Sequence, residues 1–483
     1  MRKGKTHMRP YYEMYSQEEI EMIYDAALEI LADVGLEMTH PRALEMLEGA
    51  GARVDRKSNR VYFPTELTEK CLAMAPEEFT CSGRTEEFDY TAGMYADARI
   101  RTASGAIDRF DLYRNTTARL TCADIAEQAL VADALPNVGC VGSLTPSDSP
   151  RQTYDIYSLR SLLENTRKNI WVLTSSSKNL FYQLKMLEAV CGSKETMRLG
   201  RNQGAGIFCV ISPLTITDDE IERAMLYADY GLPVKVPITT LMGGNAPYTM
   251  AGILAQATAE FMGCTVILQT IKPGIPVWYY GLFQSLDMAT GGVQYTSAEL
   301  QATFAAVAQL ARRCKIPPTT TCTTSSGCEA QQTIFNLAQG TMFNTLLGVA
   351  EQGGSGLDGN NAYSPHALIL QDEIMSYTKR ILRSCEISPE TLAVNAIAEV
   401  ATGKKEYVSA PHTLKHLRSE ERLRSKVFSY VSAQRWFENP TTLMQKTDDY
   451  LTQIKSGHEV PPLDDHVLKE IDDIVKAADK ELT

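Results

Sequence analysis

From residue 124 onward, amphipathic helical stretches alternate with short apolar runs, and this alternation constrains the fold more than any other feature of the sequence. The helical stretches are predicted over residues 124–135, 153–165, 179–191, 218–230, 250–262, 297–313, 329–347 and 366–383. The apolar runs cover residues 138–144, 169–174, 206–211, 234–241, 275–282, 318–323 and 348–351. Strands that are apolar on both faces and alternate with helices are typical of a parallel sheet covered by helices.

Seven visible strand–helix repeats favour a closed (β/α)₈ barrel, although the eighth strand cannot be located. The competing architecture is an open doubly wound sheet, but residues 141–146 read V-G-S-L-T-P, without the glycine fingerprint expected after its first strand. We therefore expect an α/β fold with a TIM-type barrel over residues 121–388. Residues 1–120 should form an N-terminal elaboration of helices and a β-hairpin at 98–110, and residues 389–483 a helical tail packed on the barrel.

Composition narrows the possible partners and the compartment. A net charge of −12 argues against nucleic acid and favours a small molecule or a protein. The least charged stretch, residues 236–271, contains Glu260 and many polar residues, so a membrane span is not expected. The basic residues 1–10 precede an acidic amphipathic stretch instead of an apolar one, and the eleven scattered cysteines suit a reducing compartment. We expect a cytoplasmic protein.

In a barrel of this type the active site lies where the strands end, and there the sequence is rich in Gly, Ser and Thr. A Schiff-base enzyme needs a lysine on a strand, but Lys235 lies near the start of its strand and reads as structural. The close pair His412 and His416 lacks the acid of H-E-x-x-H and lies in the tail, so both read as ordinary structural or surface histidines. We expect no metal site.

Aromatic residues gather where one strand opens into the predicted site: Trp278, Tyr279, Tyr280 and Phe283. By period-2 alternation, Trp278 and Tyr280 share one face of the strand. One interpretation is ordinary packing between strand and helix. The other is a cage for a quaternary ammonium group, to which each ring contributes roughly 0.5–2 kcal/mol and a nearby Glu351 would add.

Several segments together resemble the trimethylamine methyltransferase family. They are residues 105–108 (G-A-I-D), 134–138 (A-L-P-N-V), 276–281 (P-V-W-Y-Y-G), 287–292 (D-M-A-T-G-G), 297–299 (S-A-E), 325–332 (S-S-G-C-E-A-Q-Q) and 410–416 (A-P-H-T-L-K-H). The resemblance covers nearly the whole chain, in the same order.

The resemblance implies a barrel enzyme that moves a methyl group from an amine to the cobalt of a separate corrinoid protein. Archaeal members carry pyrrolysine in the loop matching residues 325–328, where this chain has ordinary residues. It is therefore similar to the non-pyrrolysine branch, whose members demethylate quaternary amines such as glycine betaine, proline betaine, carnitine and γ-butyrobetaine. The corrinoid should arrive on the partner protein rather than remain bound to this chain, and a homo-oligomer is plausible.

On this basis we predict the residues of the site. The substrate-binding residues are Trp278, Tyr280, Phe283, Glu351, Tyr95, Ser325 and Ser326, and the cofactor-binding residues are Gly353, Gly354 and Gly356. No residue is assigned acid or base catalysis, because a quaternary amine leaves as a neutral tertiary amine and needs only positioning. The substrate's carboxylate could be held by Arg99, Arg101, Arg312 or the polar loop at residues 323–326.

Two other functions stay open. A zinc enzyme that methylates a thiol could use Cys322 and Cys328 beside His366, although a five-residue gap is not a usual zinc spacing. A non-catalytic betaine-binding protein would need only the aromatic cage, but such proteins are usually exported.

Overall fold

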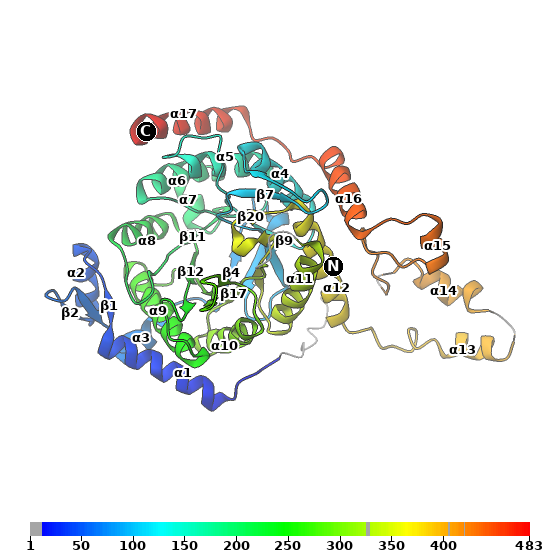
Figure 1. Ribbon diagram of the computed structural model, residues 1–483, viewed down its shortest axis with the longest axis horizontal. Helices are drawn as coiled ribbons and strands as arrows, with labels where there is room; N and C mark the ends of the chain where they lie inside the picture. The colour runs from blue at the N-terminus through cyan, green and yellow to red at the C-terminus, as the bar shows by residue number, and fades with distance from the viewer. Residues whose placement is uncertain (1–11, 325–328, 404–405, 420) are drawn as a thin grey trace.

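The computed structural model describes residues 12–324, 329–403, 406–419 and 421–483, and its centre is a closed barrel of parallel strands (Figure 1). The eight strands are β6 (Arg99–Arg101), β9 (Val138–Gly142), β10 (Asn169–Trp171), β11 (Gly204–Ile207), β12 (Val234–Ile238), β14 (Val277–Gly281), β17 (Pro318–Thr320) and β18 (Glu351–Gly353). Their order around the barrel follows the chain, and β18 closes against β6. The predicted (β/α)₈ barrel is confirmed.

The strand that the sequence did not reveal is β6. The predicted hairpin at residues 98–110 is wrong, because β6 pairs in parallel with β9 and β18, whereas β7 (Asp108–Asp111) pairs with β8 (Thr116–Arg119). Residues 99–101 therefore belong to the barrel and not to an N-terminal elaboration. The barrel begins before residue 121, and the rest of the proposed division of the chain stays a prediction.

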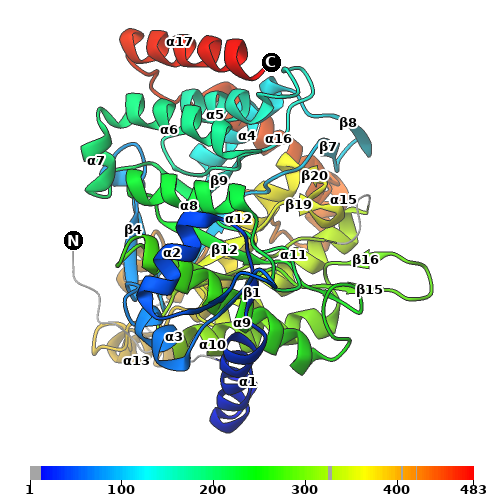
Figure 2. The ribbon, with the colours of Figure 1, turned by 90° about the vertical axis from the view of Figure 1, so that its left-hand side faces the viewer.

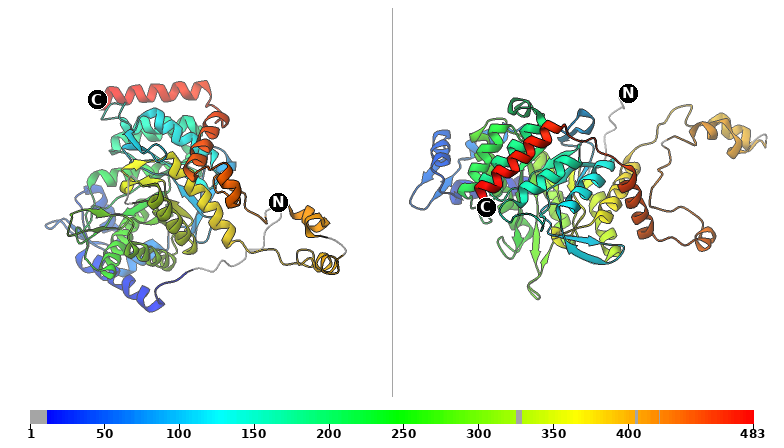
Figure 3. Two further views of the ribbon diagram at one scale, coloured as in Figure 1. Left: turned by 45° about the vertical axis from the view of Figure 1, so that its right-hand side comes forward. Right: turned by 90° about the horizontal axis from the view of Figure 1, so that it is seen from above.

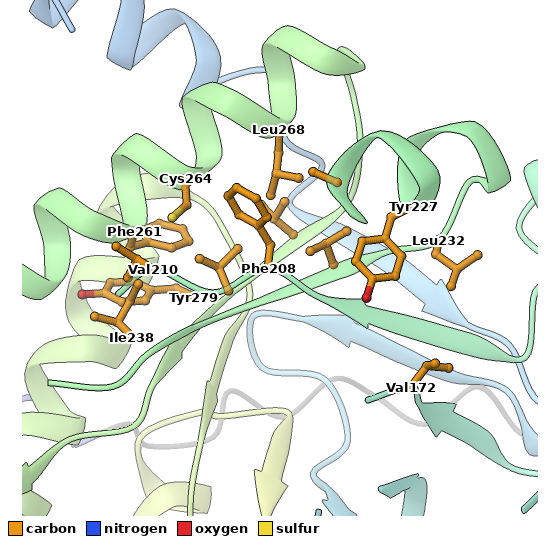
Figure 4. Close-up of a cluster of buried hydrophobic side chains, with 14 of the residues drawn as sticks. Val172, Phe208, Val210, Tyr227, Leu232, Ile238, Phe261, Cys264, Leu268 and Tyr279 are labelled. Carbon is orange, nitrogen blue, oxygen red and sulfur yellow. The ribbon is translucent and has the colours of Figure 1, made fainter. Parts of the chain in front are cut away.

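The barrel helices are α4 (Cys122–Ala134), α5 (Tyr154–Asn165), α6 (Ser177–Cys191), α7 (Lys194–Arg198), α8 (Asp218–Tyr230), α9 (Met250–Ile271), α10 (Ala298–Cys314), α11 (Ala330–Leu346) and α12 (Pro365–Leu382). Most of them start after a serine or threonine whose side chain accepts a hydrogen bond from the first turn, as Thr121, Thr217 and Ser297 do. Outward-facing strand residues pack against these helices (Figure 4), and Tyr279 stacks on Phe261 of α9 with ring centroids 4.1 Å apart.

Helix α9 is long and apolar enough to cross a membrane, but 78% of its most apolar window is buried inside the fold. It also carries the buried Glu260, which accepts hydrogen bonds from Ser212 and from the backbone N–H of Leu214. These features are those of a core helix in a large barrel.

The N-terminal residues cover the outside of α9 and one end of the barrel. Helices α1 (Gln17–Glu29), α2 (Pro41–Ala50) and α3 (Thr65–Leu72) pack on α9, and a small sheet is formed by β1 (Leu36–Glu37), β2 (Arg53–Asp55) and β3 (Arg60–Tyr62) (Figure 2). The hairpin of β4 (Glu78–Cys81) and β5 (Tyr90–Gly93) lies across the amino-terminal end of the barrel strands. Its inward side chains Cys81, Tyr90 and Ala92 join the buried residues of the barrel interior and close this end.

Short strands surround the opposite end, which we call the mouth. One sheet contains β13 (Leu241–Met242), β15 (Gln284–Leu286) and β16 (Val293–Gln294), which follow β12 and β14. Another contains β7, β8, β19 (Gly356–Leu357) and β20 (Ala362–Tyr363), which follow β6 and β18. Both sheets extend from the carboxyl ends of barrel strands, the end at which TIM barrels carry their active sites.

The C-terminal tail differs from the prediction in its first half. Helices α16 (Leu443–Gly457) and α17 (Asp465–Leu482) pack on α12, α4, α5 and α6, as expected. Helices α13 (Val394–Ala401), α14 (Pro411–His416) and α15 (Ala433–Glu438) have no buried residues and extend away from the barrel (Figures 1 and 3). Packing of the whole tail on the barrel is therefore wrong. Alternating charge predicts helices but does not indicate what they contact.

Candidate active site

The barrel interior contains a compact group of charged and aromatic side chains, which we call the interior cluster. Its members are Tyr90, Arg101, Trp171, Lys235, Trp278, Tyr280 and Glu351, each no more than 6% exposed. They come from the hairpin β4–β5 and from five different barrel strands. The cluster is therefore created by closure of the barrel.

Glu351 is the centre of the interior cluster. Its Oε1 accepts hydrogen bonds from Lys235 Nζ and, at 3.2 Å, from Arg101 Nε, while its Oε2 accepts from the Tyr90 hydroxyl at 2.6 Å. Burial acts to raise the pKa of Glu351, but the charges of Lys235 and Arg101 outweigh it and lower the pKa overall. Glu351 is therefore a buried carboxylate that neutralises one of its two cationic neighbours.

Arg101 connects this ionic centre to the aromatic rings. Its Nη2 donates to the Tyr280 hydroxyl at 2.8 Å, and its guanidinium carbon lies 4.1 Å from the centroid of the Trp171 ring. Its Nη1 makes no hydrogen bond to any residue the structure describes. Trp171 Nε1 is also buried, and it likewise lacks an acceptor within the described parts of the chain.

These contacts leave the interior with unused capacity for an anion. Two cationic groups, Arg101 and Lys235, face the single carboxylate of Glu351, and the neighbouring thiol and phenol groups stay neutral because burial raises the pKa of Cys140 to about 11 and that of Tyr90 well above its usual value. Buried N–H groups without an acceptor are rare in proteins. A carboxylate entering from the mouth would complete the hydrogen bonding of Arg101 and Trp171.

The mouth above the interior cluster is lined by partly exposed apolar side chains. Leu173, Ile207 and Leu282 lie at or just beyond the carboxyl ends of β10, β11 and β14, and they pack against the buried residues of the interior. Such a lining can shield a small apolar group, such as a set of N-methyl groups, from water.

The aromatic residues predicted from the sequence are only partly brought together. Trp278 and Tyr280 face the interior, as period-2 alternation predicted, but Lys235 lies 4.9 Å from the Trp278 ring centroid and Arg101 4.9 Å from that of Tyr280. Phe283 is not in the cluster; it is buried outside the barrel, where it stacks on Phe304 of α10 at 6.4 Å. Its placement in a cage is wrong, because β14 ends at Gly281 and the alternation does not continue.

Glu351 and Tyr95 lie farther from the mouth along the barrel axis than the sequence predicted. Glu351 was expected across the mouth, at the end of the run predicted over residues 348–351. Strand β18 instead begins at Glu351 and ends at Gly353, so Glu351 lies deep in the interior. Tyr95 lies at the closed end, where its backbone N–H faces the carbonyl of Gly348, just before β18. It follows the hairpin β4–β5 and so cannot reach over the mouth.

The glycines predicted to bind a cofactor are packed against protein instead of lining an open cradle. A Cβ added to Gly353 would lie 2.7 Å from Arg101 Nη2, one on Gly354 1.7 Å from Gln371 Oε1, and one on Gly356 1.8 Å from Asn360 Oδ1. Cofactor binding by these residues stays a prediction that these contacts do not support. Ser325 and Ser326 lie outside the described residues.

This packing makes a prediction about stability. Gly354→Ala should lower the free energy of unfolding by about 1–3 kcal/mol, because the new methyl group overlaps the side chain of Gln371. Urea denaturation measures the effect. The control is Gly49→Ala in α2, where nothing lies within 4 Å of the added Cβ and stability should rise by about 0.5–1 kcal/mol. Equal effects at both positions would contradict the packing explanation.

The other candidates from the sequence are bound elsewhere. Arg99 donates to the carbonyl of Pro136 at the closed end, and Arg312 donates to the carbonyl of Leu347 from α10, so Arg101 alone of the three reaches the interior cluster. Among the proposed zinc ligands, Cys322 contacts the carbonyl of Leu337 and His366 pairs with Asp448 at 3.0 Å, while Cys328 lies outside the described residues.

The relatives of this chain are methyltransferases. The sequence matches the trimethylamine methyltransferase family over residues 2–483. It is 26% identical over 477 residues to trimethylamine methyltransferase MttB of Methanosarcina barkeri, covering 97% of this chain and 95% of that protein. It is 24% identical over 484 residues to the glycine betaine methyltransferase of Desulfitobacterium hafniense, covering 98% of each.

A solved structure supports the fold. The crystal structure of the Methanosarcina barkeri monomethylamine methyltransferase matches with a TM-score of 0.53 and 11% sequence identity, covering 99% of this chain and 89% of the other. The chain is thus a TIM-barrel protein whose amino-terminal end is closed by the hairpin β4–β5. Its polar interior forms a site that is reached through the mouth. With the sequence match, this chain belongs to the trimethylamine methyltransferase family and is a methyltransferase.

Proposed function

We propose that this protein transfers a methyl group from a quaternary amine that carries a carboxylate to a corrinoid held by a separate protein. The observation that carries the proposal is the unused anion-binding capacity of Arg101 and Trp171 in an interior where Arg101 and Lys235 face one carboxylate. Trimethylamine has no group that would accept these hydrogen bonds. The substrate class is therefore glycine betaine, proline betaine, carnitine, γ-butyrobetaine or a similar zwitterion.

The geometry supports one orientation for such a substrate. Because the amino-terminal end is closed by β4–β5, the carboxylate would enter first and meet Arg101, with the ammonium group nearer the mouth. Leu173, Ile207 and Leu282 would then surround its methyl groups, above the Trp171 and Tyr280 rings, which already contact the guanidinium of Arg101. One N-methyl group is thereby directed toward the mouth, where a partner protein can reach it.

In the proposed reaction, the role of this chain is to position the substrate and to exclude water. The partner's corrinoid supplies the Co(I) nucleophile that takes the methyl carbon, while the electrons of the broken C–N bond stay on nitrogen and a neutral tertiary amine leaves. No proton is transferred, which fits an interior in which Glu351 is fully engaged and Tyr90 keeps its proton. Holding the substrate in line is the contribution of the interior cluster.

Other features of the chain support the proposed compartment and the proposed carrier of the corrinoid. The ten cysteines within the described residues are all free thiols, which supports a reducing cytoplasm. The packed glycines at 353, 354 and 356 support a corrinoid that arrives on its own protein. A homo-oligomer stays a prediction.

The proposal is tested by substrate choice. We expect the enzyme, given a reduced corrinoid protein, to consume Co(I) with at least one carboxylated quaternary amine and to release the corresponding tertiary amine. Choline and trimethylamine, which lack the carboxylate, should react at least about 100-fold more slowly, because the buried donors stay unpaired. Absorbance of the corrinoid and mass spectrometry of the amine measure both. Preference for trimethylamine would overturn the proposal, and binding without transfer would favour a betaine-binding protein.

A further inference from the structure

A second site lies outside the barrel, on the part of the tail that we call the arm, residues 384–440. The arm extends away from the barrel (Figures 1 and 3), and none of its helices α13, α14 and α15 has a buried residue. Large apolar side chains such as Val394, Val408 and Leu414 are more than half exposed. Ala410 and Val427 are the buried apolar residues among the described residues of the arm, so the arm has very little hydrophobic core to fix its shape.

Three metal-ligating side chains nevertheless converge in the arm. His412 and His416 lie four residues apart on α14, so they share one face of the helix, with ring centroids 4.5 Å apart. Glu390, which precedes α13, places its Oε1 2.9 Å from His416 Nε2. One ligand atom from each of the three lies within 4.8 Å of the other two.

The hydrogen bonding of His412 leaves one of its ring nitrogens available to a metal ion. His412 Nε2 is buried and has no hydrogen-bond partner in the described residues, so one imidazole nitrogen has an unused lone pair or proton. Ligand atoms around a tetrahedral zinc ion lie about 3.3 Å apart, within small side-chain rotations of the arrangement observed.

We propose that Glu390, His412 and His416 form a three-ligand site for a divalent transition metal, with zinc as the preferred ion. Two imidazoles and one carboxylate are a usual zinc ligand set, and the fourth position would hold water. The metal would join the segment before α13 to α14 and so supply the cross-link that the arm's small core does not. This site is independent of the proposed methyl transfer.

Lys415 separates this proposal from a simple ion-pair network. Its Nζ lies 2.7 Å from Glu390 Oε1, where it competes with a metal for the carboxylate. Lys415→Ala should therefore keep or strengthen metal binding. In an ion-pair network without metal, the same change would only loosen the arm.

The experiment uses the full chain, produced without a histidine tag. We expect about one zinc per chain by mass spectrometry of metals after dialysis, and slower tryptic cleavage in the arm with zinc than with chelator. The double variant His412→Ala/His416→Ala should lose at least about 100-fold in zinc affinity, while the exposed His466→Ala keeps it. An unchanged melting temperature of the barrel would show that the double variant is folded.

Three results would overturn the site. They are equal zinc content in the wild type and the double variant, loss of zinc in Lys415→Ala, and arm cleavage that does not respond to zinc. Retention of zinc by the double variant would also make Cys322 and Cys328 the candidate zinc ligands. Because none of these measurements requires corrinoid or amine, failure of this site and failure of the proposed function are distinguishable.

Discussion

Replacing Arg101 by methionine should reduce kcat/KM for a carboxylated quaternary amine by about 100- to 1,000-fold. The guanidinium of Arg101 keeps an Nη1 group without a hydrogen-bond partner in the described residues, and without it the substrate's carboxylate would lose its main anchor. The loss of kcat/KM should be confined to substrates that carry a carboxylate. Choline, which never uses the anchor, should change less than about tenfold.

The comparison between substrates distinguishes anchoring from mere stability. Arg99→Met changes the neighbouring arginine of the same strand, which binds the carbonyl of Pro136 at the closed end, and it should leave kcat/KM close to that of the wild type. Thermal unfolding checks that the Arg101 variant is folded. An equal loss for choline and for betaine substrates would show that Arg101 supports the fold without contacting the carboxylate.

Glu351→Gln should lower the free energy of unfolding by about 3–5 kcal/mol. The change removes the buried carboxylate that pairs with Lys235 and Arg101, so both cations lose this counter-charge. Denaturant unfolding measures the loss. The control is Glu48→Gln, whose carboxylate pairs with Arg56 at the surface and should contribute less than about 1 kcal/mol.

The same carboxylate predicts a pH dependence. Because its pKa in the folded protein is lowered, the stabilisation from Glu351 is present above the ordinary glutamate pKa and is lost as the pH falls through the folded value. Glu351→Gln should therefore flatten the acid side of the stability curve. The double variant Lys235→Met/Glu351→Gln should recover part of the stability, and no recovery would mean that the pair is not the source of the loss.

Much of the barrel was predictable, because its strands are apolar on both faces and its helices begin with capping residues. The bounds of α8 agree with the sequence prediction at both ends. Residues 99–101 were predicted as part of a hairpin strand and not of the barrel, because the partners of β6, β9 and β18, are distant from it in sequence. The run predicted at residues 348–351 was placed too early, because β18 covers Glu351–Gly353.

The site could be predicted only in part for the same physical cause. Alternation identifies Trp278 and Tyr280 as sharing a face, but nothing in the spacing of residues 101, 235 and 351 indicates that their charges meet. That meeting depends on closure of the barrel, which joins β18 to β6. The errors at β6 and at Glu351 both lie where charged residues replace apolar ones inside the barrel, and in this chain that location is the proposed site.

The hairpin β4–β5 has a consequence for the order of events in the proposed reaction. Since it closes the barrel at one end, the amine, the departing amine and the methyl acceptor must all use the same opening. The amine has to bind first, because a docked acceptor would cover the entrance, and the demethylated amine leaves only after the acceptor has separated. Turnover is then a strictly ordered cycle, in which an acceptor docked on the empty enzyme is a dead-end complex and an excess of acceptor slows the reaction.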